Sequence, residues 1–178
     1  GVVGLEGGED FLGVVEEVAG DRHVIEVGVP FSDPLADGPV IQRATERALA
    51  AGTTLSGVLD LIGREREAVS APIVLFSYAN PILRFGSTRF ADRARDVGVD
   101  GVLVLDLPIE EAGEFRVLLG ERGIDTILLL SPTTTDERLE KAAALGSGFL
   151  YAISRLGVTG ARVGLGPWYS KPATIAVE

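Results

Sequence analysis

A glutamate stands in the middle of an apolar stretch near the start of the chain. The stretch reads "VIEVGVPFSDPLADGP", from Val24 to Pro39, and Glu26 lies between isoleucine and valine. Burying an ionised carboxylate is costly unless the group is paired, neutralised or used in chemistry. A second acid, Asp37, follows eleven residues later. The two are a candidate acid/base pair, because a carboxyl group whose pKa is raised toward neutrality can both accept and donate a proton.

Both acids also have a purely structural interpretation. Glu26 can be a buried carboxylate held by a backbone amide or an arginine, since structural ion pairs also perturb pKa values. Asp37 can cap a helix that opens at Pro39, because Asp-Gly-Pro is ordinary turn and cap chemistry. The same applies to Asp33 in "FSDPL". The residues alone leave both interpretations open.

Other candidate side chains follow later apolar runs. Asp106 ends "VLVLDLP" as a site residue or a strand-end cap, and Tyr78 in "SYANP" either lines a pocket or packs. Thr159 and Gly160 in "GVTG" offer hydroxyl and amide donors or form a plain loop. His23 is the only histidine, which leaves a histidine-based metal cluster or a Ser-His-Asp triad without support. We therefore expect no metal site.

Short apolar, β-branched runs alternate with helical patterns along the chain. The continuous runs are typical of parallel strands covered on both faces, and predict strands at 23–29, 72–78, 101–107, 126–130 and 148–154. Alternation places Glu26 on one face of the first strand and its aliphatic neighbours on the other, helix-facing side. Glu26 is therefore expected to point into the interior, near the carboxyl end of its strand.

Amphipathic patterns with recognisable ends predict the helices. They cover 9–20, 39–52, 54–69, 87–98, 109–123 and 135–146, with Pro39 at a first helical position and Ser87 as an N-cap. Glycines follow most of these patterns as C-terminal stops. From about residue 72 onward, the spacing from one predicted strand to the next is that of one β-turn-α unit. The first gap is longer, because it holds a loop and two helical patterns.

Two parallel architectures compete for this pattern. A doubly wound sheet usually carries a glycine-rich phosphate loop after its first strand, and neither G-x-G-x-x-G nor G-x-x-x-x-G-K-[ST] is present. A (β/α)8 barrel instead collects polar residues at the carboxyl ends of several strands, as this chain does. We expect one α/β domain over 1–178, of the (β/α)8 TIM-barrel type, with about five βα units and therefore an incomplete barrel.

Composition excludes several classes of protein. The 178 residues are 46% hydrophobic and 24% charged, as in globular domains. The net charge of −10 and the lack of a Lys/Arg cluster argue against a nucleic-acid partner. No apolar run approaches the ~20 residues of a membrane span. The absence of cysteine fits a reducing, cytoplasmic location.

Several segments together resemble the tryptophan synthase alpha chain family. They read "EVGVPFSDPLADGPVIQRATERALAAG", "SYANPILRFG", "VLVLDLPIEEAGEF", "LLLSPTTTDERL" and "GFLYAISRLGVTGAR", and their order and spacing agree over about 9–162. The resemblance implies a (β/α)8 barrel that cleaves indole-3-glycerol phosphate to indole and glyceraldehyde 3-phosphate by a retro-aldol reaction. It implies no metal or organic cofactor, and a partner β chain that carries pyridoxal phosphate in an α2β2 complex.

The resemblance also assigns roles to residues. Glu26 matches the catalytic glutamate, which protonates C3 of the indole ring and deprotonates the glycerol hydroxyl beside the breaking bond. Asp37 matches the catalytic aspartate, which stabilises the positive ring nitrogen and takes its N–H proton. Asp33 and Pro34 match the loop that contacts the β chain. Further substrate-binding or loop-supporting positions are implied at Ile41, Tyr78, Leu103, Asp106, Tyr151, Thr159 and Gly160.

The chain departs from the family pattern at both ends. The opening strand pattern is replaced by "GVVGLEGG", and the tail 163–178 resembles nothing in the family. The later glycine-rich segments that hold the substrate phosphate are missing with it. The expectation is a shortened chain that keeps both proton-transfer residues and lacks most of the phosphate clamp. The alternative is a catalytically inactive fragment that only docks to the β chain.

Overall fold

The computed structural model describes residues 24–35, 37–153 and 175–177. The six strands within these ranges form one parallel sheet. Each strand pairs with its neighbour in the sequence, in the order β1-β2-β3-β4-β5-β6. Sequential parallel pairing with helical connections is the build of a (β/α) barrel. The strands are β1 (Ile25–Gly28), β2 (Ile73–Ser77), β3 (Gly101–Val104), β4 (Asp125–Leu130), β5 (Leu150–Ala152) and β6 (Ile175–Val177).

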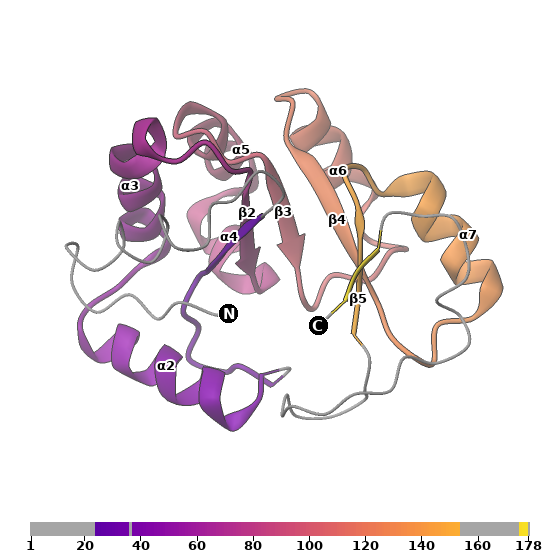
Figure 1. Cartoon of the computed structure of the whole chain (residues 1–178), viewed down its shortest axis with the longest axis horizontal. Coiled ribbons are helices and arrows are strands. Elements are labelled where there is room, and N and C mark those ends of the chain that lie inside the picture. Colours follow the sequence, from indigo (N-terminus) through magenta and orange to yellow (C-terminus); the bar gives the residue numbers. More distant parts are fainter. Residues whose placement is uncertain (1–23, 36, 154–174, 178) are drawn as a thin grey trace.

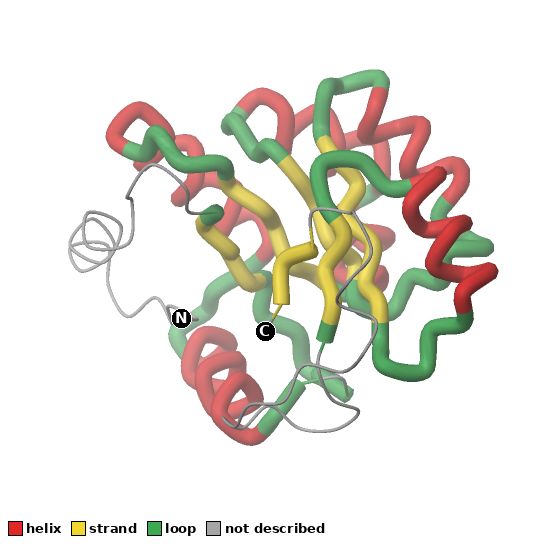
Figure 2. The backbone as a smooth tube through the Cα atoms, turned by 45° about the vertical axis from the view of Figure 1, so that its right-hand side comes forward, coloured by secondary structure: helices red, strands yellow, loops and turns green. Residues whose placement is uncertain are grey.

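Helices connect the strands from β1 to β5, and several of them pack against the outer face of the sheet. Figure 1 shows α3 and α5 beside the first strands and α6 and α7 beside the last, and Figure 2 shows the strands at the centre. The helices are α2 (Pro39–Ala50), α3 (Leu55–Glu65), α4 (Ala79–Phe85), α5 (Ser87–Asp96), α6 (Gly113–Gly120) and α7 (Asp136–Leu145), with a short 3-10 helix η1 (Arg66–Ala68) after α3. None of the helices in the described ranges is long and apolar enough to cross a membrane.

Apolar side chains pack on both faces of the sheet. On the outer face Val27 packs in one cluster with helix residues such as Leu59 and Phe90. On the inner face the buried cluster consists of Val74, Leu103, Ile127 and Tyr151. Burial on both faces explains why these strands read as continuous apolar runs.

The predicted alternation along β1 is confirmed. Val27 belongs to the outer core, and Ile25 packs against it. Glu26 is in register with Val74, a member of the inner cluster, and registered partners of parallel strands face the same side. Glu26 therefore lies on the inner face, two residues before the end of β1.

The opposite end of the sheet is held by an ion pair. An Arg66 guanidinium nitrogen lies 3.1 Å from Asp100 Oδ2, which also accepts a hydrogen bond of 2.8 Å from the amide of Ile73. Arg66 further donates to the carbonyl of Ala71 at 2.8 Å. These bonds fix the starts of β2 and β3, so this polar group has a structural role at the amino ends of the strands.

Most predicted elements are present, with differences that have local causes. The five predicted strands are confirmed, but β6 was not expected, because "TIAV" is too short a run to stand out. Helix α4 was not expected either. The prediction of Ser87 as an N-cap was wrong: Gly86 occupies that position with φ +94°, and no side chain caps the helix. The predicted helix 9–20 lies outside the described residues.

Helix α6 begins later than predicted, at Gly113 rather than at Ile109. The amides of Glu111 and Ala112 both donate to the carbonyl of Pro108, each at 3.0 Å, so this segment is a turn that precedes the helix. The carboxyl edge of β3 is therefore followed by a compact loop. That edge is where the candidate site residues gather.

Candidate functional site

The candidate site lies beyond the carboxyl ends of β1, β2 and β3. Asp37 lies in the loop between β1 and α2, Tyr78 directly follows β2, and Asp106 lies two residues after β3. Because parallel strands end at the same edge, their following loops meet there. The structure brings these three residues together through two hydrogen bonds.

The Asp37 side chain is fixed by a tyrosine. Tyr78 Oη donates to Asp37 Oδ2 at 3.1 Å, linking residues 41 positions apart in the sequence. The main chain of Asp37 is also held, since its amide donates to the carbonyl of Pro34 at 3.1 Å and its carbonyl accepts from Gln42 Nε2 at 2.8 Å. The carboxylate therefore has a defined direction although it lies in a loop.

Asp37 is not the cap of the helix that follows it. The N-cap of α2 is Gly38, with Pro39 as the first helical residue, and no side chain accepts a hydrogen bond from the first turn. The structural interpretation of Asp37 as a helix cap is therefore wrong. Its carboxylate does not cap the helix and accepts a hydrogen bond from Tyr78 instead.

Tyr78 is buried, with 5% of its surface exposed. Its ring lies 5.1 Å from the ring of Phe31, at an interplanar angle of 37°. Ser77 Oγ donates to its carbonyl at 2.9 Å. A buried tyrosine hydroxyl needs a polar partner, and Asp37 supplies one. Tyr78 thus packs against Phe31 and also binds Asp37 in the candidate site.

The environment changes the acidity of Asp37. Burial raises the pKa of the Asp37 carboxyl above its ordinary value of 3.8, and the hydrogen bond from Tyr78 partly offsets this by stabilising the charged form. A carboxylate that is costly to keep charged is a good acceptor for a proton or for a cationic N–H group.

Asp106 accepts a hydrogen bond from the start of α4, the helix that follows β2. Its Oδ1 accepts from the amide of Ala79, the first residue of α4, at 2.6 Å. Asp106 therefore does not cap its own strand but binds the turn that carries Tyr78. The prediction of Asp106 as a substrate-binding residue stays a prediction, since this oxygen faces an amide of the chain.

The remaining predicted substrate positions fall into three groups. Leu103 and Tyr151 belong to the inner-face cluster, where the Tyr151 ring lies 5.2 Å from Phe76 in an edge-on arrangement of 72°. Ile41 lies on α2, where it is half-buried and is not a member of that cluster. Thr159 and Gly160 lie outside the described residues.

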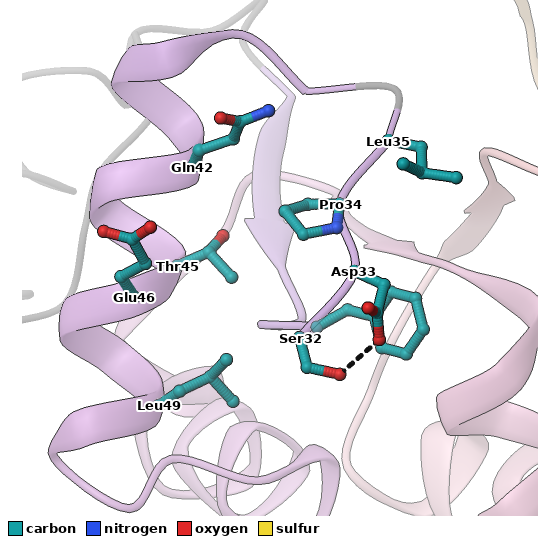
Figure 3. Close-up of a pocket in the computed structure, with 9 residues that line it drawn as sticks. Ser32, Asp33, Pro34, Leu35, Gln42, Thr45, Glu46 and Leu49 are labelled. Carbon is teal, nitrogen blue, oxygen red and sulfur yellow. Dashed lines mark hydrogen bonds between the residues drawn. The ribbon is translucent and has the colours of Figure 1, made fainter.

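The loop predicted to contact a partner borders a hollow of about 270 Å³ on the side of α2. Figure 3 shows Asp33, Pro34 and Leu35 on one wall and side chains of α2 on the other. Ser32 Oγ donates to Asp33 Oδ2 at 2.7 Å, and Leu35 is 95% exposed. No residue of α2 is buried. Leu35 therefore presents an apolar side chain to solvent beside this hollow.

Within the described ranges, no group of three or more His, Asp or Glu side chains is placed to hold a metal ion. Sequence reasoning missed Phe31 and Ser77 as supports of Tyr78. It also missed the amide of Ala79, because a backbone donor carries no sequence signal. The motif "SYANP" placed Tyr78 after a strand but not against Asp37.

The chain is similar to known proteins in both sequence and fold. The family model described as "Tryptophan synthase alpha chain" matches residues 2–166. The tryptophan synthase alpha chain of Geobacter sulfurreducens is 54% identical over 142 residues, covering 80% of this chain and 54% of the relative. That of Methylococcus capsulatus is 56% identical over 145 residues, covering 81% and 54%. The chain thus spans about half the length of the curated relatives it matches.

Solved structures show the same fold. Tryptophan synthase subunit alpha from Legionella pneumophila superposes with a TM-score of 0.75 at 39% identity, covering 80% of this chain and 54% of that one. A structure of the tryptophan synthase a2b2 complex from Pyrococcus furiosus gives 0.75 at 44% identity, covering 81% and 58%. The (β/α) barrel type is confirmed.

The raised pKa of Asp37 predicts a pH-dependent effect of Asp37→Asn. The folded state binds the Asp37 proton more tightly than the unfolded state, so its contribution to stability is present at low pH and is lost as the pH rises through the folded pKa. We expect Asp37→Asn to raise the free energy of unfolding at pH 7, and the gain to vanish below pH 3.8. Urea denaturation at several pH values measures this.

The matched control is Asp33→Asn, which removes the same charge from an exposed position in the same loop. A lower stability of Asp37→Asn than of the unmodified chain at pH 7 would contradict the electrostatic account.

Proposed function

Because the chain belongs to the tryptophan synthase alpha chain family, we propose that its site cleaves indole-3-glycerol phosphate to indole and glyceraldehyde 3-phosphate. The observation that carries the proposal is the hydrogen bond of 3.1 Å from buried Tyr78 to the Asp37 carboxylate. Asp37 lies in the loop after β1, the strand on which Glu26 faces inward. The family match over 2–166 covers all of these residues. The proposal needs no metal and no organic cofactor.

The chemistry requires two proton transfers around one carbon–carbon bond. A proton added to C3 of the indole ring makes the ring an electron-accepting cation. Loss of the proton from the hydroxyl on the adjacent glycerol carbon then forms the aldehyde carbonyl, and the bond between this carbon and C3 breaks. The electron pair of the broken bond restores the aromatic ring, so indole and the aldehyde are released with no external oxidant or reductant.

Glu26 is proposed as the acid and then the base of this sequence. It is half-buried on the inner face, in register with buried Val74. A carboxyl group in such a site can deliver a proton to C3 and, as the carboxylate, remove the hydroxyl proton. One residue then serves both steps.

Asp37 is proposed to stabilise the cation. Protonation of C3 places positive charge on the ring nitrogen, and the N–H group becomes a strong donor. A carboxylate whose direction is fixed before the reaction stabilises this charge without reorganisation. The bonds of Asp37 to Tyr78, Pro34 and Gln42 support this role, because they hold both its side chain and its main chain.

We also propose a β chain as the protein partner. The Pyrococcus furiosus relative is described as part of a tryptophan synthase a2b2 complex. The segment 32–35, which we call the docking loop, projects Leu35 into solvent beside the hollow against α2. No observation favours the alternative of an inactive fragment that only docks, and the turnover test below separates the two.

Substitution of either acid is expected to abolish indole release. Glu26→Gln and Asp37→Asn should each lower the turnover rate by about 10²-fold or more, the usual loss for a general acid/base group. The measurement is the initial rate of indole formation from indole-3-glycerol phosphate with a β chain present.

Asp96→Asn is the control for these variants, since Asp96 is an exposed residue at the end of α5, where it forms an ion pair with Arg95 at 2.7 Å. Absence of indole from the unmodified chain, with stimulation of the β chain retained, would replace the proposal by the docking alternative. Full activity in Glu26→Gln would remove Glu26 from the mechanism.

The docking loop is expected to contribute to the affinity of the chain for a β chain. Leu35→Asp is expected to weaken binding to a β chain at least about tenfold, because it places a charge where an apolar anchor is buried on association. Val117→Asp on α6 is the matched control, since Val117 is also an exposed apolar residue, at 51%, on a different part of the molecule. Titration calorimetry measures both. Equal affinities of the two variants would exclude the docking loop from the interface.

A further inference from the structure

Two hydrogen bonds, made by neighbouring residues, link the end of β3 to the loop that contains Asp37. The first joins Asp106 Oδ1 to the amide of Ala79 at 2.6 Å. The second joins Tyr78 Oη to Asp37 Oδ2 at 3.1 Å. Ala79 and Tyr78 are adjacent, so one turn of the main chain connects the two bonds. This turn is the start of α4, a helix that the sequence did not reveal.

The position of this turn decides where the Tyr78 hydroxyl lies. The ring of Tyr78 is long and pivots about its Cα, so a small shift of the turn displaces the hydroxyl by more than the shift itself. On the strand side the turn is anchored by the hydrogen bond from the amide of Leu105 to the carbonyl of Ser77, at 2.9 Å. On the helix side, the first amide of α4 donates to Asp106.

The first amide of a helix has no partner within its own helix. The N-cap residue of α4 is Tyr78 itself, and its side chain does not cap the helix but points to Asp37. The amide of Ala79, at the first helical position, takes its acceptor from Asp106 in the connection that follows β3. A charged acceptor makes a stronger bond than a neutral one. Asp106 thus satisfies an amide that has no partner within α4.

We propose that Asp106 is a positioning residue for the candidate active site. By binding the amide of Ala79 it fixes the turn that carries Tyr78, and Tyr78 then directs the carboxylate of Asp37. The role matters for catalysis only if the proposed function holds, but the coupling itself is a property of the folded chain. Asp106 acts on the site without contact with substrate.

The test measures the pKa of Asp37 by ¹³C NMR titration of the full 178-residue chain labelled at aspartate carboxyl carbons. The Asp37 signal is assigned by its loss in Asp37→Asn. Tyr78→Phe is expected to raise the Asp37 pKa, because the hydrogen bond from Tyr78 lowers it. This variant sets the full effect of losing the tyrosine.

Asp106→Ala and Asp106→Asn separate geometry from charge. Both remove the negative charge, but the asparagine keeps an acceptor oxygen for the amide of Ala79. We expect the Asp37 pKa to be higher in Asp106→Ala than in Asp106→Asn, and the difference to disappear in the Tyr78→Phe background. Equal values in the two variants would overturn the proposal, and so would a difference that persists without the tyrosine hydroxyl.

Ala79→Pro tests the same bond from the donor side and keeps Asp106 intact. Proline is tolerated at the first position of a helix, and Tyr78 at φ −87° and ψ 160° already has the extended conformation that a following proline requires. We expect this variant to raise the Asp37 pKa toward the value in Tyr78→Phe, with an unchanged circular dichroism spectrum. A folded Ala79→Pro chain with the unmodified pKa would overturn the proposal.

These readouts need no turnover. If the chain releases no indole but the pKa coupling is observed, the proposed function fails and the positioning role of Asp106 stands. If indole is released but the coupling is absent, the reverse holds.

Discussion

The hydrogen bond between Tyr78 and Asp37 is the constraint on which the candidate site depends. It joins the loop after β1 to the turn after β2 at 3.1 Å, and it gives a loop carboxylate a fixed direction. Without it, Asp37 would share the freedom of an exposed loop, and ordering it would have to occur at the moment of reaction. A preorganised carboxylate avoids that cost. The burial that makes Asp37 a good proton acceptor is tolerated because the tyrosine hydroxyl remains its partner.

The sheet supplies the frame for this bond. On the outer face, Val27 of the sheet and Phe90 of α5 belong to one core cluster. On the inner face, Leu103 belongs to a second buried cluster. The bonds of Asp100 fix the amino ends of β2 and β3, and the candidate site lies at the carboxyl ends. The stabilising bonds and the candidate site thus lie at opposite ends of the same strands, as is usual in this fold.

The sequence predicted much of this arrangement. The apolar runs gave the five strands, and alternation along β1 gave the inward direction of Glu26, because both follow from local pattern. It could not predict that Tyr78 binds Asp37, since the contact spans 41 positions and depends on the register of β1 and β2. Helix α4 was hidden because "ANPILRF" contains a proline and is only seven residues long. The role of the Ala79 amide depends on the backbone alone, so no residue type announces it.

In the proposed reaction, Glu26 transfers a proton to C3 of the indole ring while Asp37 stabilises the resulting cation. The most direct measurement is exchange of the C3 hydrogen of indole in D2O, followed by proton NMR, because it needs neither the glycerol phosphate nor its binding site. The account predicts that the chain accelerates this exchange above the rate in buffer and that Glu26→Gln returns it to the buffer rate. Exchange at the buffer rate with the folded, unmodified chain, or undiminished exchange in Glu26→Gln, would contradict it.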